Sequence, residues 1–155
     1  MHIHRLDKIW MIFGIGMLGV FLLVLGVSTF AMGMQPPTGH EHVQLSGDGS
    51  HHPDFEPQLK QVGEKEYVAD MTAFIFSYGP EKIEIPAGSK VRFNVTSTDV
   101  VHGFQIPRTN VNMMVMPGQV NSVEHTFHEP GEYLILCNEY CGASHEFMKA
   151  TVIVK

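Results

Sequence analysis

The sequence predicts an all-β domain, a sandwich of antiparallel strands with Greek-key connections, preceded by a single N-terminal transmembrane helix. Two observations lead to this fold class. Residues 9–34 contain no charged residue, and a run of that length is what a membrane-spanning helix requires. From residue 65 onward, short runs of alternating apolar and polar residues recur between Pro and Gly positions, which is the pattern of a β-sandwich.

The uncharged run at residues 9–34 is predicted to be a membrane anchor. At about 1.5 Å per residue it would reach about 39 Å, more than a bilayer core of about 30 Å. Ala31 and Gly33 would also suit a cleaved signal peptide, but the apolar region of such a peptide has only about 7–15 residues, so an uncleaved anchor is favoured. Arg5 and Lys8 precede the run. The positive-inside rule therefore places residues 1–8 in the cytoplasm and the C-terminal part outside.

Residues 35–64 change in composition to a polar stretch rich in Gly, Pro and His. Such a composition predicts a linker without regular structure. Its histidines could gather a metal ion, but a solvated tether is the favoured interpretation for all four of them: His40, His42, His51 and His52.

The remaining residues, 65–155, are predicted to form the sandwich. Val91, Phe93 and Val95 alternate with polar residues, so this segment has the pattern of a strand with one buried face. The methionine-rich run 113–116 is interpreted as the end of a strand before Pro117, and His125 and His128 as surface residues. The predicted strands are residues 67–76, 82–85, 91–95, 120–127, 133–136 and 151–154.

The charge of the outer part of the chain limits its partners. Residues 35–155 contain eight Lys or Arg and fifteen Asp or Glu, which gives a net charge of −7 with histidine neutral. An acidic surface speeds the encounter with a basic protein and disfavours nucleic acid. We therefore expect no nucleic-acid binding.

The chemistry of the chain is concentrated in residues 137–148. Cys137, Cys141, His145 and Met148 have the spacing C-x3-C-x3-H-x2-M, and the chain has no other cysteine. Thiolate and thioether are soft ligands that select copper, imidazole also suits copper, and a weak methionine ligand recurs in electron-transfer copper sites. His102 offers a second imidazole upstream. The pattern therefore predicts a copper site.

Three other interpretations of this segment remain open at the level of sequence. The four positions would share one face of an α-helix and could be a core stripe, although the apolar run 133–136 has the pattern of a strand that leads into a loop. Cys137 and Cys141 could form a disulfide on the oxidising side of a membrane, which leaves His145 and Met148 unexplained. Two cysteines with two histidines could hold zinc, which has no use for Met148.

These residues carry a resemblance to a known family. The motif Cys-x-Glu-x-Cys-Gly-x-x-His-x-x-Met after Pro-Gly-Glu-Tyr, with Asp-Val-x-His-x-Phe upstream, resembles the CuA domain of subunit II of haem-copper cytochrome c oxidases over about residues 66–155. The resemblance implies a cupredoxin-like sandwich with a binuclear copper centre, CuA. By this resemblance, Cys137 and Cys141 would bridge the two copper ions. His102 and Met148 would complete the ligands of one copper, and His145 and the Glu139 carbonyl those of the other.

The resemblance also implies roles outside the copper ligands. The segment of Phe74 and Phe76 aligns with the electron-entry segment, although many relatives carry Trp there and these phenylalanines could equally be core residues. The phenylalanines in place of Trp, together with the single membrane anchor, make the chain similar to the B-type branch of these oxidases. In relatives with glutamate at position 139, the side chain helps to hold magnesium at the interface with subunit I, which makes Glu139 a candidate magnesium ligand.

The implied function is that of subunit II of the respiratory chain's cytochrome c oxidase. Such a chain accepts electrons from cytochrome c and passes them to haem in subunit I, where oxygen reduction is coupled to proton pumping. It would be anchored in the cell membrane by one span, with the copper domain on the outer, periplasmic face. Two alternatives remain: the copper-bearing small subunit of a nitric oxide reductase, and a membrane-anchored copper carrier.

Overall fold

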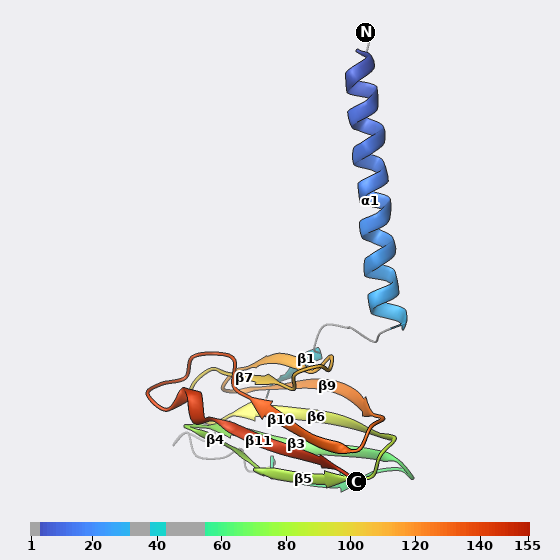
Figure 1. The fold of residues 1–155 in the computed structure, drawn as a ribbon. Coiled ribbons are helices and arrows are strands. Elements are labelled where there is room, and N and C mark those ends of the chain that lie inside the picture. Colours follow the sequence, from blue (N-terminus) through green and yellow to red (C-terminus); the bar gives the residue numbers. More distant parts are fainter. Residues whose placement is uncertain (1–3, 32–37, 43–54) are drawn as a thin grey trace. The chain divides into compact units, whose positions relative to one another are not determined.

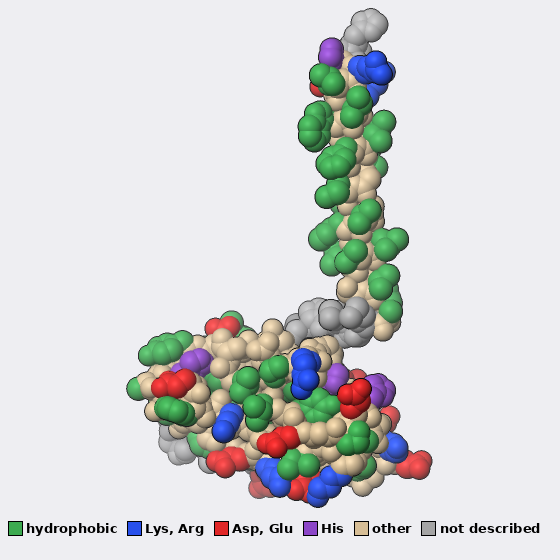
Figure 2. All heavy atoms as spheres, viewed as in Figure 1, with side chains coloured by type: hydrophobic (Ala, Val, Ile, Leu, Met, Phe, Trp, Pro, Cys, Tyr) green, Lys and Arg blue, Asp and Glu red, His purple; other side chains and the backbone are tan. Residues whose placement is uncertain are grey.

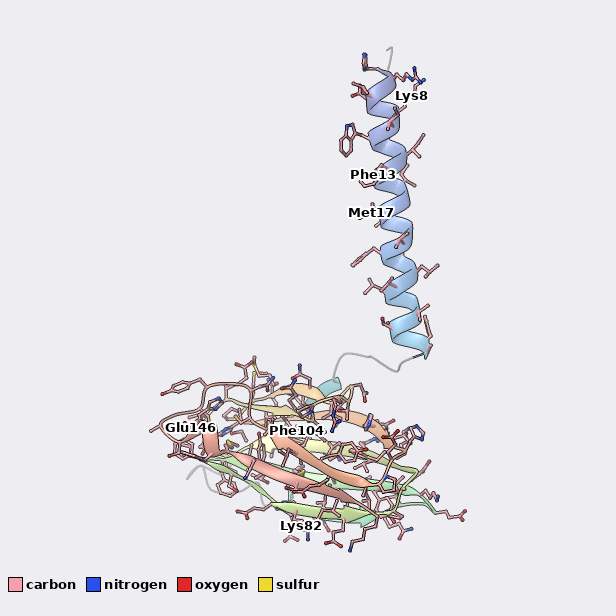
Figure 3. The ribbon with its side chains drawn as sticks, viewed as in Figure 1. Lys8, Phe13, Met17, Lys82, Phe104 and Glu146 are labelled. Carbon is pink, nitrogen blue, oxygen red and sulfur yellow. The ribbon has the colours of Figure 1, made fainter. Side chains whose placement is uncertain are left out.

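The computed structural model describes residues 4–31, 38–42 and 55–155, and the chain divides into two compact units at about residue 35. The first unit contains α1 (Arg5–Ala31), which has no buried residue. It is long and apolar enough to cross a membrane. Apolar side chains line α1, and its basic residues, including Lys8, lie near its N-terminal end (Figures 2 and 3). The helix begins four residues before the predicted span, because a polar first turn does not prevent helix formation.

The second unit is a sandwich of two β-sheets (Figure 1). One sheet has the order β1-β9-β6-β3-β2, with β4 paired to β3, and the other has the order β5-β11-β10-β7-β8. The strands of the first sheet are β1 (Thr38–His42), β2 (Gln58–Gln61), β3 (Glu66–Phe74), β4 (Ser77–Gly79), β6 (Ser89–Ser97) and β9 (Gln119–Phe127). Those of the second are β5 (Lys82–Ile85), β7 (His102–Gln105), β8 (Asn112–Val115), β10 (Gly131–Leu136) and β11 (Lys149–Val154).

All six predicted strands are present, with small differences at their ends. The methionine run forms β8, as the strand interpretation required. The prediction of antiparallel pairing is wrong for two strand pairs, since β3 pairs with β6 and β5 with β11 in parallel. Alternation of apolar residues reveals which face of a strand is buried but not the direction of its neighbour, so the sequence alone could not reveal these pairs.

The prediction that residues 35–64 lack regular structure is wrong for two short segments. β1 pairs with β9 and β2 pairs with β3, and both strands lie at the edges of their sheet. An edge strand is held by backbone hydrogen bonds to one neighbour, so it needs no alternating apolar pattern. His51 and His52 lie outside the described residues.

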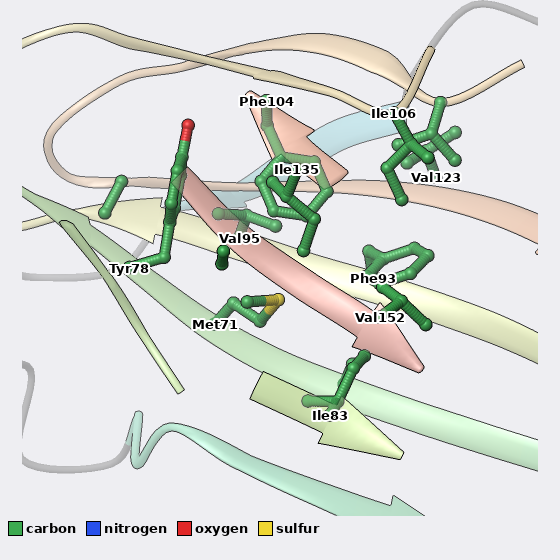
Figure 4. Packing of buried hydrophobic residues seen from close by; sticks show 14 of the residues in the cluster. Met71, Tyr78, Ile83, Phe93, Val95, Phe104, Ile106, Val123, Ile135 and Val152 are labelled. Carbon is green, nitrogen blue, oxygen red and sulfur yellow. The ribbon is translucent and has the colours of Figure 1, made fainter. Parts of the chain in front are cut away.

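The core lies between the two sheets and is built on aromatic contacts. Phe93 packs against both Phe104 and Phe127, with ring centroids 5.5 and 6.2 Å apart. Tyr78 meets Phe104 edge to face at 5.7 Å. These rings are fully or almost fully buried (Figure 4), and buried aromatic pairs add to the stability gained from burial. The site described below is therefore attached to a rigid scaffold.

His125 departs from its interpretation as a surface residue. It is half-buried in β9, its Nδ1 atom lies 2.5 Å from Asn110 Oδ1, and its ring packs edge-on against Phe127. Burial, and to a lesser extent the nearby His128, lower the pKa of His125. The surface interpretation is correct for His128.

Candidate metal centre

The predicted ligands of residues 137–148 lie on the loop between β10 and β11. β10 pairs with β11 up to Leu136, and the chain then leaves the sheet at Cys137 and returns at Lys149. Within the loop, only His145–Phe147 form a short 3-10 turn, on which Glu146 is labelled in Figure 3. The α-helical stripe is therefore not the explanation of the cysteine and histidine spacing.

The loop folds so that its donor atoms converge on Cys141. The Cys141 sulfur lies 3.8 Å from the Cys137 sulfur, 3.5 Å from His145 Nδ1 and 3.7 Å from Met148 Sδ. The Cys137 sulfur lies 3.2 Å from the Glu139 carbonyl oxygen and 4.0 Å from His102 Nδ1. The structure thus brings together all six predicted donors, although 46 residues separate the first from the last in the sequence.

The donors differ in their access to solvent. His102 is fully buried, Met148 is 2% exposed, and each cysteine is 9% exposed. His145 is only half-buried, and the side chain of Tyr140 packs edge-on beside it. One imidazole of the cluster is therefore enclosed by protein while the other lies near the surface.

Asp99 fixes the orientation of the buried imidazole. One carboxylate oxygen of Asp99 lies 2.7 Å from His102 Nε2, and the other accepts a hydrogen bond from the Ile75 amide at 2.6 Å. Burial of Asp99 acts to raise its pKa, but its hydrogen bonds with His102, Val100 and Ile75 outweigh this effect and lower the pKa. A carboxylate acceptor at Nε2 leaves the Nδ1 lone pair free for a metal ion, as in many metal sites.

The chemistry of the donor set fits copper better than a disulfide or zinc. Both cysteines are free thiols, and their sulfurs are 3.8 Å apart, well beyond a disulfide bond of about 2.0 Å. A structural zinc site closes with four donors, whereas here a thioether and a carbonyl are added to two thiols and two imidazoles. Burial, with a further contribution from Cys137, raises the pKa of the Cys141 thiol to about 11. A metal ion must therefore displace its proton on binding.

Two glycines that the sequence analysis did not treat as functional allow the ligand loop to pack closely against its neighbours. A Cβ atom on Gly103 would lie 1.9 Å from Asn138 Oδ1 and 2.5 Å from the Asn138 backbone nitrogen. Gly142 has a φ of +137°, and a Cβ there would lie 2.9 Å from the ring of Phe76. Each glycine stands beside a predicted ligand, which is the signal in the sequence that could have revealed it.

The two phenylalanines of the predicted electron-entry segment differ in their surroundings. Phe74 is 39% exposed at the end of β3. Phe76 is partly buried, packs against the core, and lies against Gly142, the residue that follows Cys141. The segment is tied to the ligand cluster a second time by the bond from the Ile75 amide to Asp99.

Comparison with known proteins identifies the family. The family described as "Cytochrome C oxidase subunit II, periplasmic domain" matches residues 66–155. The chain is also 39% identical over 153 residues to a cytochrome c oxidase subunit 2 of Thermus thermophilus, covering 96% of this chain and 91% of that protein. The chain belongs to the cytochrome c oxidase subunit II family.

Further comparisons agree with membership of the subunit II family. A second Thermus thermophilus cytochrome c oxidase subunit 2 is 47% identical over 95 residues, which cover 61% of this chain and 70% of that protein. A solved chain from a haem-copper terminal oxidase dimer has a TM-score of 0.82 and 29% identity, and covers 97% of this chain and 100% of that chain. The expected family and the cupredoxin-like sandwich with its apolar N-terminal helix are confirmed. As a subunit II, the chain works within an oxidoreductase complex with other oxidase subunits.

Proposed function

We propose that this subunit II holds a binuclear copper centre, takes up electrons from a cytochrome c and passes them to haem in subunit I. The observation that carries the proposal is the pair of thiols 3.8 Å apart, each beside its own imidazole. Two neighbouring thiols, each beside a different imidazole, suit two metal ions rather than one. Cys137 and Cys141 would be shared between the coppers, His102 and Met148 would serve one copper, and His145 and the Glu139 carbonyl the other.

The residues around the cluster would keep its geometry constant in both oxidation states. When bound, the copper pair supplies one-electron redox chemistry. The loop is anchored at both ends by the β10–β11 ladder, Asp99 orients His102, and burial of Met148 excludes water. Ligands held by a rigid scaffold move little when the charge changes, which favours fast electron transfer.

The entry and exit of electrons would use different parts of the cluster's surroundings. Phe74 and Phe76 are the proposed entry point, supported by the exposure of Phe74 and by the contact of Phe76 with Gly142. The acidic outer part of the chain would attract a basic cytochrome c. Oxygen reduction and proton pumping would belong to subunit I, and α1 would anchor the chain in the cell membrane with the copper domain on the periplasmic face.

The copper content and magnetic spectrum of the chain test this proposal directly. The full chain in detergent, loaded with copper, should bind two copper ions and show hyperfine coupling of one unpaired electron to both nuclei. A spectrum from a single copper nucleus, at one copper per chain, would refute the binuclear site. Co-purification with a haem-bearing subunit would exclude a free copper carrier, and gas consumption by that complex would separate oxygen from nitric oxide reduction.

Replacing Met148 by leucine should retain copper but change its reduction potential. The thioether lies 3.7 Å from the Cys141 sulfur and is almost fully buried, so leucine can fill the same space at a cost below about 1.5 kcal/mol. A weak axial ligand tunes the potential more than it holds the metal. Voltammetry and turnover of the assembled oxidase should show a shifted potential and slower electron transfer. Met113→Leu in the buried face of β8 is the control, and loss of copper from Met148→Leu would contradict the axial role.

The Glu139 backbone and side chain should have separate roles. Its carbonyl oxygen faces the Cys137 sulfur at 3.2 Å, and any residue supplies a carbonyl, so Glu139→Gln should leave the copper spectrum of the isolated chain unchanged. A carboxylate suits a hard cation such as magnesium. In the assembled oxidase we expect the substitution to lower the bound divalent metal or to slow electron transfer.

Glu146→Gln, on the exposed 3-10 turn of the same loop, is the matched control for the Glu139 experiment. It should change neither the copper spectrum nor the metal content of the oxidase. If Glu139→Gln behaves in the same way, the Glu139 carboxylate has no role at the interface with subunit I. If it removes copper from the isolated chain, the assignment of the carbonyl alone to copper is wrong.

A further inference from the structure

Gly103 occupies the point at which the pairing of β7 with β10 stops. Gln105 pairs with Leu136, and continuing the antiparallel register by two residues would place Gly103 opposite Asn138. The chain has already left the sheet there, so the backbone groups of Gly103 find other partners. Its amide donates to the Cys137 sulfur at 3.4 Å, and its carbonyl accepts a hydrogen bond from the Tyr78 hydroxyl at 2.5 Å. A thiol and a phenol thus replace the missing strand neighbour.

Tyr78 is placed in the core in a way that packing alone does not explain. The residue lies in β4, is fully buried, and meets Phe104 edge to face; Figure 4 labels both residues and shows the Tyr78 hydroxyl oxygen in red. Phenylalanine would fill the same space without the cost of removing a hydroxyl from water. A tyrosine hydroxyl has an ordinary pKa of about 10 and is protonated at neutral pH, so it can act as the donor in this hydrogen bond.

Gly103 is restrained on its third side by the ligand loop. The space where a side chain would stand is taken by the backbone nitrogens of Asn138 and Glu139. Residue 103 also follows His102 directly, so movement of its backbone would move a predicted ligand as well as the donor to the Cys137 sulfur. On the core side, the Tyr78 hydroxyl holds the Gly103 carbonyl by a hydrogen bond.

We propose that Tyr78 is a positioning residue for the copper centre: through the Gly103 carbonyl it holds the Gly103 amide on the Cys137 sulfur and so raises the reduction potential. A hydrogen bond to a ligating thiolate withdraws electron density from the sulfur, and hydrogen bonding around the sulfur tunes the potential of copper and iron–sulfur sites. Weakening that bond makes the sulfur a stronger donor and stabilises the oxidised metal. The inference rests on the proposed copper function of Cys137.

The test is Tyr78→Phe in the copper-loaded full chain, compared with Tyr133→Phe. Tyr133 is a close match, since it also packs edge-on against a phenylalanine and donates its hydroxyl to a backbone carbonyl, that of Glu129, at 3.0 Å. We expect both variants to bind the wild-type amount of copper. Tyr78→Phe should have a lower reduction potential and a shifted sulfur-to-copper absorption band, whereas Tyr133→Phe should keep both at their wild-type values.

A purely structural role for Tyr78 predicts a different result. Tyr78→Phe would then lower the unfolding temperature without moving the potential or the absorption band beyond the range of Tyr133→Phe, and the inference would be overturned. If Tyr78→Phe does not load copper, 3-fluorotyrosine at position 78 provides a second test. This residue keeps the ring and hydroxyl but is a stronger donor, so the potential should rise, and an unchanged potential would overturn the inference.

Failure of the copper proposal is distinguishable from failure of this inference. If the wild-type chain shows no coupling of an electron to two copper nuclei, the proposed function fails before any variant is made. If the wild-type chain has that spectrum and neither Tyr78 variant changes the potential, only the positioning role of Tyr78 is wrong.

Discussion

Cys141→Ser should abolish the two-copper spectrum and stop electron transfer through the chain. The Cys141 sulfur contacts three of the other proposed ligands, namely Cys137, His145 and Met148, at 3.5–3.8 Å. A serine hydroxyl has nearly the same shape but is a hard donor that does not replace a bridging thiolate. The variant should bind at most one copper per chain, with hyperfine coupling to one nucleus, and oxidase turnover should fall to background.

The matched control for Cys141→Ser is Ala143→Ser, which adds a hydroxyl to an exposed position of the same loop and should leave copper content and turnover unchanged. Cys137→Ser provides a second comparison, because a shared pair of sulfurs requires both cysteines equally. If Cys141→Ser still binds two copper ions and couples the electron to both nuclei, Cys141 is not a bridge. If Ala143→Ser also loses copper, the loop is sensitive to any change and the experiment does not identify a ligand.

The donors of the ligand loop were predictable because these residues lie close together in the sequence. Cys137, Cys141, His145 and Met148 fall within twelve residues, and a soft donor set of this spacing indicates copper before any fold is known. His102 is 35 residues away, so it was available as a second imidazole but spacing did not tie it to the loop, and its assignment to one copper came from the resemblance to the oxidase family. The structure then shows why it is near, since β7 pairs with β10 beside the start of the loop.

The parts that hold these donors were not predictable, because they depend on contacts between distant backbones. Gly103 and Asn138 become neighbours only when β7 and β10 lie side by side. In the sequence, Tyr78 falls between the predicted strands 67–76 and 82–85, and its hydroxyl acquires a partner only through the contact of β4 with β7. The strands β1 and β2 were missed for a related reason, since edge pairing needs backbone groups rather than a residue pattern.

Gly103→Ala should disrupt copper binding although position 103 supplies no ligand atom. The added methyl group would lie 2.5 and 2.8 Å from the backbone nitrogens of Asn138 and Glu139, which cannot turn aside as a flexible side chain can. Overpacking typically costs about 1–3 kcal/mol, which corresponds to an affinity lower by about 5- to 150-fold if the loop must keep its copper-bound form. Competition with a copper chelator should measure this loss.

Gly63→Ala separates the effect of overpacking at the site from the general cost of replacing a glycine by alanine. Its nearest neighbours are atoms of the exposed Glu66, at 3.2 Å and beyond. This contact is milder than the one at Gly103 and involves no residue of the ligand loop, so copper affinity should be unchanged. If Gly103→Ala binds copper as tightly as Gly63→Ala does, the ligand loop tolerates displacement and the close approach of β7 is not needed. If Gly103→Ala loses copper affinity while its unfolding temperature matches that of Gly63→Ala, the methyl group acts on the ligand loop rather than on the stability of the sandwich. The reason would be that β7, which carries His102, must approach the start of the loop at Cys137 more closely than a side chain at position 103 allows.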